Sequence, residues 1–303
     1  MTTAPTKLVL QPRDLQLLSC LGEHSILDTD MIHARFFAGA SLRRCQQRLA
    51  LLQQQGLTRT VALTLWSAEA SGCSVPTVHS LTERGAEAIE TLTGHHPPRV
   101  SRGDPKPEMI HHRLQIIRTK LALDDACRSL RVALPTWILE QDRDYSASDK
   151  LPPSHRRILY HAFPGPLRKT TCQPDAAFRM SVPRELTNSA AGSSDLIGFF
   201  EIDCSSEGRK QIAGKLPGYS ALISQRTFQR YFPKSDQAIV RLFWVCRTWE
   251  RIQSLCDRLK DDPVAAYCRF ATAADLTSTT ALTSPIWHAT DGKRREIIRL
   301  PNR

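Results

Sequence analysis

A polar, proline-rich segment divides the sequence into two parts. Residues 93–110 contain four prolines among histidine, charged and small side chains, and this composition disfavours both helix and strand. We therefore expect an exposed and partly extended linker, with one domain over residues 1–92 and a second over residues 111–303. Because the chain has 303 residues, each domain is large enough to bury a hydrophobic core of its own.

Composition excludes several other classes of protein. Hydrophobic side chains make up 41% of the chain and are spread along it, which excludes an intrinsically disordered protein. No apolar run reaches the roughly 18 residues of a membrane-spanning helix, and the first residues lack the apolar core of a signal peptide. The nine cysteines do not have the spacing of a zinc site and are expected to be reduced and mostly buried. We therefore expect a cytoplasmic protein that does not associate with membranes.

Three short helical patterns open the first domain. Residues 12–22, 29–37 and 41–56 place apolar side chains at helical spacing. The first pattern begins with a proline, which the first turn of a helix tolerates, and is expected to end near Gly22. Polar residues that can cap a helix precede the other two patterns.

A two-stranded wing is expected to follow these helices. The β-prone residues 57–66 and 77–81 are separated by a stretch that contains glycine, serine and proline, as in a hairpin, and a fourth helix begins near Thr82. This order of elements is that of a winged helix-turn-helix domain, in which the third helix contacts DNA.

The arginines of this domain gather on the third helix and the wing. Residues 31–68 contain five arginines and no acidic residue, although residues 1–110 as a whole carry 11 basic and 10 acidic side chains. A local excess of this kind is typical of a surface that binds the DNA backbone. A protein-interaction domain whose arginines only form a solvated face is the alternative. The side chains expected to bind DNA are Arg43, Arg44, Gln47, Arg48 and Arg59.

The second domain is predicted to be a mixed α/β sandwich with the order α-β-β-β-α-β. Pro217 and Gly218 are expected to interrupt or kink its second helix. The predicted elements are a helix over 112–131, strands over 135–140, 174–182 and 197–203, a helix over 207–224 and a buried strand over 238–246.

Three acidic side chains fall at the ends of neighbouring predicted strands. Asp175 lies at the start of one strand, and Glu201 and Asp203, which are two residues apart at the end of another, point to the same face. Carboxylate oxygens are the ligands that Mg²⁺ prefers. A lysine from the following helix, Lys210 or Lys215, can orient an attacking water and offset the charge that builds on a phosphate.

This order of elements resembles the core of the PD-(D/E)XK nuclease superfamily. Together with the N-terminal winged helix, the segments PDAAFRM, FFEID, GKLPGY and LFWVCRT are similar to the replication-relaxation family of plasmid and mobile-element proteins. The resemblance implies a protein that binds double-stranded DNA and acts in the replication, relaxation or mobilisation of an extrachromosomal element. Replication or mobilisation proteins are further expected partners. A homodimer is compatible with the resemblance.

The resemblance also implies roles for individual residues. The superfamily's lysine would stand two residues after Glu201, where this sequence has Asp203, and in some relatives the following helix supplies the lysine instead. On that basis Asp175, Glu201 and Lys215 are the catalytic residues, with Lys210 as the alternative lysine. Asp175, Glu201 and Asp203 are the expected Mg²⁺ ligands. The other interpretation is a domain that has lost catalysis and whose acids only pair with basic neighbours.

Two further classes of function stay open alongside a mobile-element protein. One is a transcriptional or copy-number regulator with a catalytically silent domain for dimerisation or partner binding. The other is a metal-dependent defence or toxin nuclease. An ATPase is not supported, because the sequence has no Walker A motif.

Overall fold

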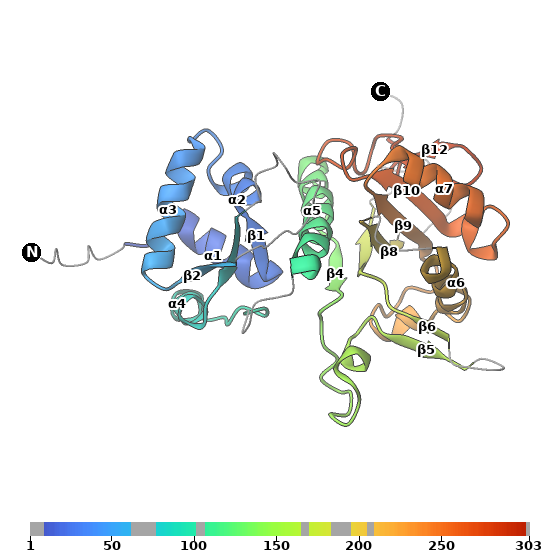
Figure 1. Ribbon diagram of the computed structural model, residues 1–303, viewed down its shortest axis with the longest axis horizontal. Coiled ribbons are helices and arrows are strands. Elements are labelled where there is room, and N and C mark those ends of the chain that lie inside the picture. Colours follow the sequence, from blue (N-terminus) through green and yellow to red (C-terminus); the bar gives the residue numbers. More distant parts are fainter. Residues whose placement is uncertain are drawn as a thin grey trace, which may run out of the picture. The chain divides into compact units, whose positions relative to one another are not determined.

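The computed structural model confirms the mixed α/β class of the protein (Figure 1). The chain divides into two compact units, Met1–Arg118 and Thr119–Arg303, which we call the N-terminal and C-terminal units. This division falls inside helix α5 (Pro107–Leu130). The structure describes residues 9–61, 77–100, 107–164, 170–182, 195–204 and 209–300.

The described residues of the N-terminal unit before α5 form the helices α1 to α4 and a three-stranded antiparallel sheet of order β1-β3-β2, all drawn from blue to cyan in Figure 1. The predicted elements within the described residues are present, and β1 is an addition that pairs with β3. The second half of the predicted strand 57–66 lies outside the described residues. The elements are α1 (Pro12–His24), β1 (Ile26–Asp28), α2 (Thr29–Phe36), α3 (Leu42–Gln54), β2 (Thr58–Val61), β3 (Val78–Leu81) and α4 (Glu83–Thr93).

Local side-chain caps explain where three of these helices begin. The Asp28 carboxylate accepts a hydrogen bond from the Met31 amide at 2.8 Å, and the Thr82 hydroxyl accepts one from the Gly85 amide at 3.1 Å. The Ser41 hydroxyl accepts a longer bond of 3.4 Å at the start of α3. The polar residues that precede the apolar patterns are therefore N-caps, as the sequence indicates.

The proline-rich segment is packed in part and is not simply an exposed linker. Helix α1 continues two residues past Gly22, where an added Cβ would lie only 2.4 Å from Cβ of Pro97. Pro97 is buried, and the Arg99 amide donates to the Gly22 carbonyl at 2.9 Å. Gly22 is therefore needed for this close approach and does not mark the end of α1.

The C-terminal unit is built on a seven-stranded sheet of order β12-β11-β10-β9-β8-β7-β4. Strands β8, β9 and β10 are parallel, and the other neighbours are antiparallel. A separate hairpin, β5-β6, was not predicted. The elements after α5 are β4 (Thr136–Leu139), β5 (His161–Phe163), β6 (Thr170–Cys172), β7 (Ala176–Ser181), β8 (Asp195–Asp203), α6 (Arg209–Ser224), β9 (Ile239–Cys246), α7 (Trp249–Leu259), β10 (Cys268–Thr272), β11 (Trp287–His288), β12 (Arg294–Arg295) and the 3₁₀ turns Pro153–Arg156, Thr227–Arg230 and Pro263–Tyr267.

Helix α6 is continuous through Pro217, so the predicted interruption is wrong. Gly218 has a packing role, because an added Cβ would lie 2.4 Å from the Thr171 carbonyl oxygen of β6. The glycine thus lets α6 lie directly against the β5-β6 hairpin, and this contact fixes the rotation of the helix about its axis.

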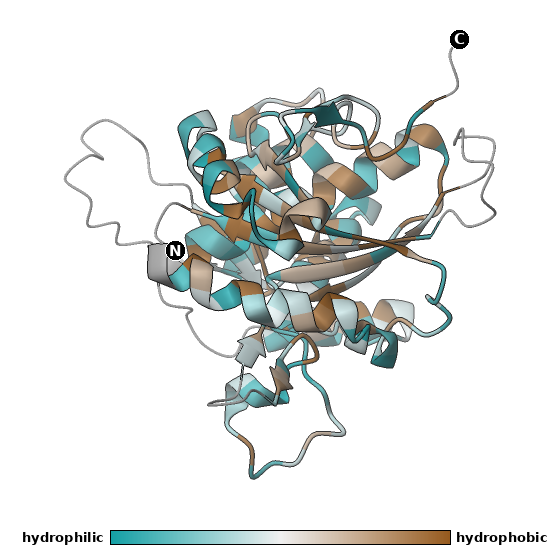
Figure 2. Ribbon diagram, turned by 90° about the vertical axis from the view of Figure 1, so that its right-hand side faces the viewer, coloured by the Kyte–Doolittle hydropathy of each residue, from teal (hydrophilic) through white to brown (hydrophobic). Residues whose placement is uncertain are grey.

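Both faces of the large sheet carry large buried side chains. On one face Phe199, Trp244 and Phe270 pack with residues of α6 and α7. On the other, the ring centroids of Phe200 and Phe243 lie 5.2 Å apart. The strands are mostly brown in Figure 2, whereas the helices alternate between brown and teal, as amphipathic helices do.

Two expectations from composition can be examined in the described part of the chain. Its eight cysteines form no disulfide with one another, and six of them are buried. None of its helices combines the length and hydropathy needed to cross a bilayer.

Candidate functional site

Three acidic residues lie where β4 and β8 end and β7 begins, at one end of these neighbouring strands of the large sheet; we call this region the sheet edge. The backbone amide of Asp175 donates to the Phe200 carbonyl at 2.9 Å, and the amide of Glu140 donates to the Asp175 carbonyl at 2.8 Å. These bonds extend the β7-β8 and β4-β7 ladders by one residue. Glu140, Asp175 and Glu201 therefore occupy neighbouring positions on three adjacent strands, which lie about 4.8 Å apart.

Glu201 is held by two donors from α6. Its side chain is buried, the Lys215 Nζ donates to Oε2 at 2.6 Å, and the Tyr219 hydroxyl donates to Oε1. Lys215 and Tyr219 are four residues apart, so they lie one above the other on the same side of the helix. The structure thus brings two of the predicted catalytic residues, Glu201 and Lys215, into direct contact.

The other two predicted acids have different partners. Asp203 is also buried, and its carboxylate accepts a hydrogen bond of 2.6 Å from Arg251 Nε of α7. The Asp175 carboxylate accepts one of 2.7 Å from the Ile202 amide. The side chain of the alternative lysine, Lys210, lies outside the described part of the structure.

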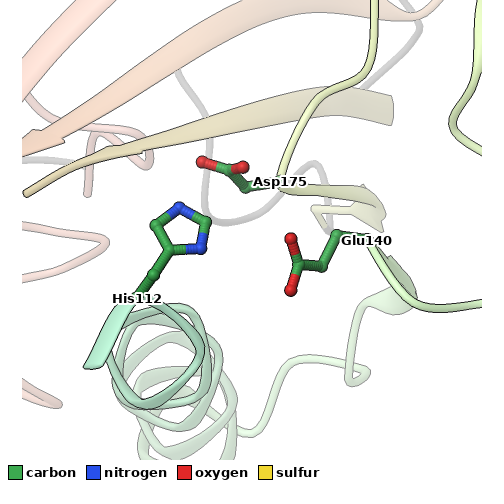
Figure 3. Close-up of side chains that lie close together, drawn as sticks. All are labelled: His112, Glu140 and Asp175. Carbon is green, nitrogen blue, oxygen red and sulfur yellow. The ribbon is translucent and has the colours of Figure 1, made fainter. Parts of the chain in front are cut away.

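Asp175 has a second carboxylate beside it that the sequence analysis missed. One carboxylate oxygen of the buried Glu140 lies within 4.8 Å of one of Asp175. Figure 3 shows both side chains as sticks, with His112 of α5 also labelled. Glu140 is the last residue of a predicted strand, the same kind of position as Glu201, and this shared position is the signal that could have identified it.

Two thiols beside these acids are neutral. Burial, with a contribution from Glu201, raises the pKa of the Cys172 thiol well above its ordinary value. Burial, with a contribution from Asp203, likewise raises the pKa of Cys246. Neither thiol therefore contributes a negative charge to this part of the sheet at neutral pH.

The second group of predicted site residues lies on α3 of the N-terminal unit. Cys45, Leu49 and Leu52 are buried and form the inner side of the helix. Arg43, Arg44 and Gln47 are exposed. For the Arg43 and Arg44 side chains, the described residues provide no hydrogen-bond acceptor or ion-pair partner.

Arg48, in contrast, pairs with a buried acid. Asp14 is fully buried, and Arg48 Nε donates to its Oδ1 at 2.9 Å while Nη2 donates to its Oδ2. Nη2 also donates to the Val9 carbonyl at 2.9 Å. The hydrogen bond with Asp14 raises the pKa of Arg48. The charge of Arg48 thus compensates a buried carboxylate and joins α3 to α1.

Arg59 is held along the β2-β3 pair. It lies opposite Ser80 in the β2-β3 pair, and its Nε donates to the Ser80 hydroxyl at 3.1 Å. Its side chain is only partly exposed. Of the five predicted DNA-binding residues, three are therefore exposed on α3 and two are bonded to neighbouring elements of the same unit.

A family model described as replication-relaxation matches residues 18–234. The match is 217 residues long in a chain of 303 and runs from within α1 to the loop between the 3₁₀ turn Thr227–Arg230 and β9. It includes α3 and the residues Glu140, Asp175, Glu201 and Lys215. No curated protein and no solved structure matched the chain.

Proposed function

The chain belongs to the replication-relaxation family, and from this premise we propose that it binds duplex DNA of a plasmid or mobile element through its N-terminal unit. The observation that carries the proposal is the exposed surface of α3 with Arg43, Arg44 and Gln47. In a helix-turn-helix unit, residues near the start of the second helix of the motif reach base edges and phosphates. Arginine is suited to both, because its guanidinium donates to phosphate oxygens and to guanine.

The electrostatics of α3 support this docking surface. Arg43 and Arg44 occupy the first turn of the helix, where the macrodipole adds partial positive charge and favours an approaching anion. The first turn contains no acidic residue. An exposed pair of arginines at such a position changes the free energy of unfolding little and attracts a polyanion strongly.

The test is the affinity of the full chain for a labelled 20-base-pair duplex, measured by fluorescence anisotropy. We expect Arg43→Ala with Arg44→Ala to weaken binding at least tenfold, because two charge-assisted contacts to DNA are removed. The control is Arg84→Ala with Lys260→Ala, which removes the same charge from exposed positions on α4 and after α7. Equal affinities for the two double variants would exclude docking through α3.

We further propose that the sheet edge of the C-terminal unit is a nuclease-like site. The carboxylates of Glu140 and Asp175, which have oxygens within 4.8 Å of each other, are oxygen donors of the kind that Mg²⁺ takes, and Glu201 occupies the neighbouring position on β8. A cation held there would supply Lewis acidity for hydrolysis of a phosphodiester. The Lys215 ammonium, 2.6 Å from Glu201, would orient water and offset phosphate charge, and the Tyr219 hydroxyl holds the Glu201 carboxylate in place.

A catalytically silent domain is the competing function, and the buried Asp203–Arg251 pair favours it. Buried acids paired with cations also occur in ion-pair networks that have no catalytic role. In this case the N-terminal unit would act as the DNA-binding part of a transcriptional or copy-number regulator, and the C-terminal unit would bind a partner or a second copy.

Supercoiled plasmid incubated with the protein and Mg²⁺ or Mn²⁺ separates the two functions. We expect nicking that Asp175→Asn and Glu201→Gln abolish. The matched control is Asp195→Asn, at the opposite end of β8, where Asp195 pairs with Arg179 at 2.6 Å. Absence of nicking with every metal and DNA form would favour the silent domain.

A further inference from the structure

A small cavity lies beside α3 in the N-terminal unit. Its volume is about 280 Å³, and its walls come from the start of α1, the end of α2 and one side of α3. Ligand sites for drug-sized molecules are roughly 300–1,000 Å³, so this cavity has the size for a small group. The polar and aromatic side chains that line it include Gln11, Arg13, Phe37, Arg44, Gln47 and Arg48.

The lining is strongly basic. Three arginines contribute to it and no acidic residue does. Asp14 pairs with one of them, Arg48, whereas Arg13 and Arg44 have no acidic partner in the part of the chain that the structure describes. Gln11 and Gln47 add side-chain amides that can donate hydrogen bonds. Such a lining suits an anion with several acceptor oxygens.

The Arg13 side chain is held in place by two neighbouring side chains. Its guanidinium carbon lies 4.1 Å from the centre of the Phe37 ring, and its Nη2 donates to Gln11 Oε1 at 3.3 Å. Its Nε is buried and has no hydrogen-bond acceptor among the described atoms. The other guanidinium N–H groups of Arg13 are the donors that remain for an anion in the cavity.

We propose that this cavity binds a phosphate group. The proposal rests on the proposed function in one respect, namely that the phosphate is a backbone phosphodiester of the duplex that meets α3. Arg44 and Gln47 belong both to the cavity wall and to the exposed surface of α3, so a strand that follows this helix passes the mouth of the cavity. A small phosphorylated compound is the other source of the same chemical group.

The first arm of the test uses inorganic phosphate and the full chain. Replacing chloride with phosphate at constant ionic strength should raise the melting temperature of the wild type, because a ligand of the folded state stabilises it. The rise should persist in Arg84→Gln, a control with the same change of charge on α4. It should be lost in Arg13→Gln and in Arg44→Gln. The second of these variants changes an exposed residue and guards against misfolding of the first.

The second arm identifies the source of the phosphate. If the group is a backbone phosphodiester, free phosphate should compete with a 20-base-pair duplex and weaken binding severalfold in the wild type, but not in Arg13→Gln. Stabilisation by phosphate without competition would instead assign the cavity to a small phosphorylated compound.

The outcomes separate this inference from the proposed function. The cavity site is overturned if phosphate does not raise the melting temperature of the wild type. It is also overturned if phosphate raises the melting temperatures of Arg13→Gln and Arg44→Gln as much as that of the wild type. A wild type that binds no duplex overturns the proposed function, and the phosphate arm alone then decides whether the cavity binds phosphate.

Discussion

The arginines of α3 and the acids of the large sheet differ in how their charge is used. In the N-terminal unit, Arg43 and Arg44 are exposed, and among the described residues neither has an ion-pair partner. In the C-terminal unit, Glu201 and Asp203 are buried, and each accepts a short hydrogen bond from a cation on a covering helix. Among the described residues, these two charges of α3 are therefore exposed and unpaired, whereas these two acids of the sheet are buried and paired with cations.

Arg48 shows that the distinction depends on burial and not on the unit. It lies one helical turn from Arg44, yet it pairs with the fully buried Asp14. Removal of an exposed charge changes the free energy of unfolding by about 0.5 kcal/mol or less. Removal of one partner of a buried pair leaves an uncompensated charge and costs several times more.

The largest expected effect is therefore that of Arg48→Ala. We expect it to lower the free energy of unfolding by about 3 kcal/mol, because Asp14 would remain buried without its cation. The measurement is urea denaturation followed by circular dichroism, with the neighbouring Arg44→Ala as the control. If Arg48→Ala unfolds like the wild type and only loses affinity for DNA, Arg48 belongs with the exposed arginines.

Acid should destabilise both units through buried histidines. Burial lowers the pKa of His79 in the N-terminal unit to about 4 and that of His161 in the C-terminal unit to about 3. The unfolded chain, with histidine pKa values near 6.5, binds more protons between these values and pH 6.5. The free energy of unfolding should therefore fall as the pH drops from about 6.5 towards 4.

The variant His79→Gln isolates the contribution of one unit. For a single such histidine the loss between pH 7 and pH 5 is about 2 kcal/mol, and the variant should lack this part of the pH dependence. Urea denaturation at the two pH values measures it. A variant with the same pH dependence as the wild type would show that His79 is not the titrating group.

A smaller effect is expected at the sheet edge from Tyr219→Phe. The change removes one of the two donors to the buried Glu201 carboxylate but keeps the ring and the Lys215 contact. The expected loss is about 1–2 kcal/mol in the free energy of unfolding. A negligible loss would indicate that Glu201 is more accessible to water than its buried position implies, and would weaken the contrast between the two units.

Features that depend on neighbouring residues were predictable from the sequence. The caps at Asp28, Ser41 and Thr82 act on amides three residues ahead, and the apolar spacing of α3 gives its buried side directly. The strand that follows Asp175 and the strand that contains Glu201 were recognisable because both are β-prone runs with acidic residues near one end.

Features that depend on residues far apart in the chain could not be predicted from the sequence. The ion pair of Arg48 joins residues 34 positions apart, and β1 pairs with a strand about 50 residues away, so neither leaves a local signal. Pro97 was assigned to a linker because nothing in its neighbourhood shows that Gly22 offers it a place to pack. Glu140 was missed for another reason, because its position at a strand end was visible but its proximity to Asp175 was not.

The most direct test of the central claim is the salt dependence of duplex binding. A protein that neutralises DNA phosphates releases counterions, and each contact contributes about 0.9 to the slope of log K against log salt concentration. With Arg43 and Arg44 both changed to Ala, the account predicts a slope that is smaller by about two and an unchanged free energy of unfolding. An unchanged slope would contradict the proposal that the exposed arginines of α3 bind DNA.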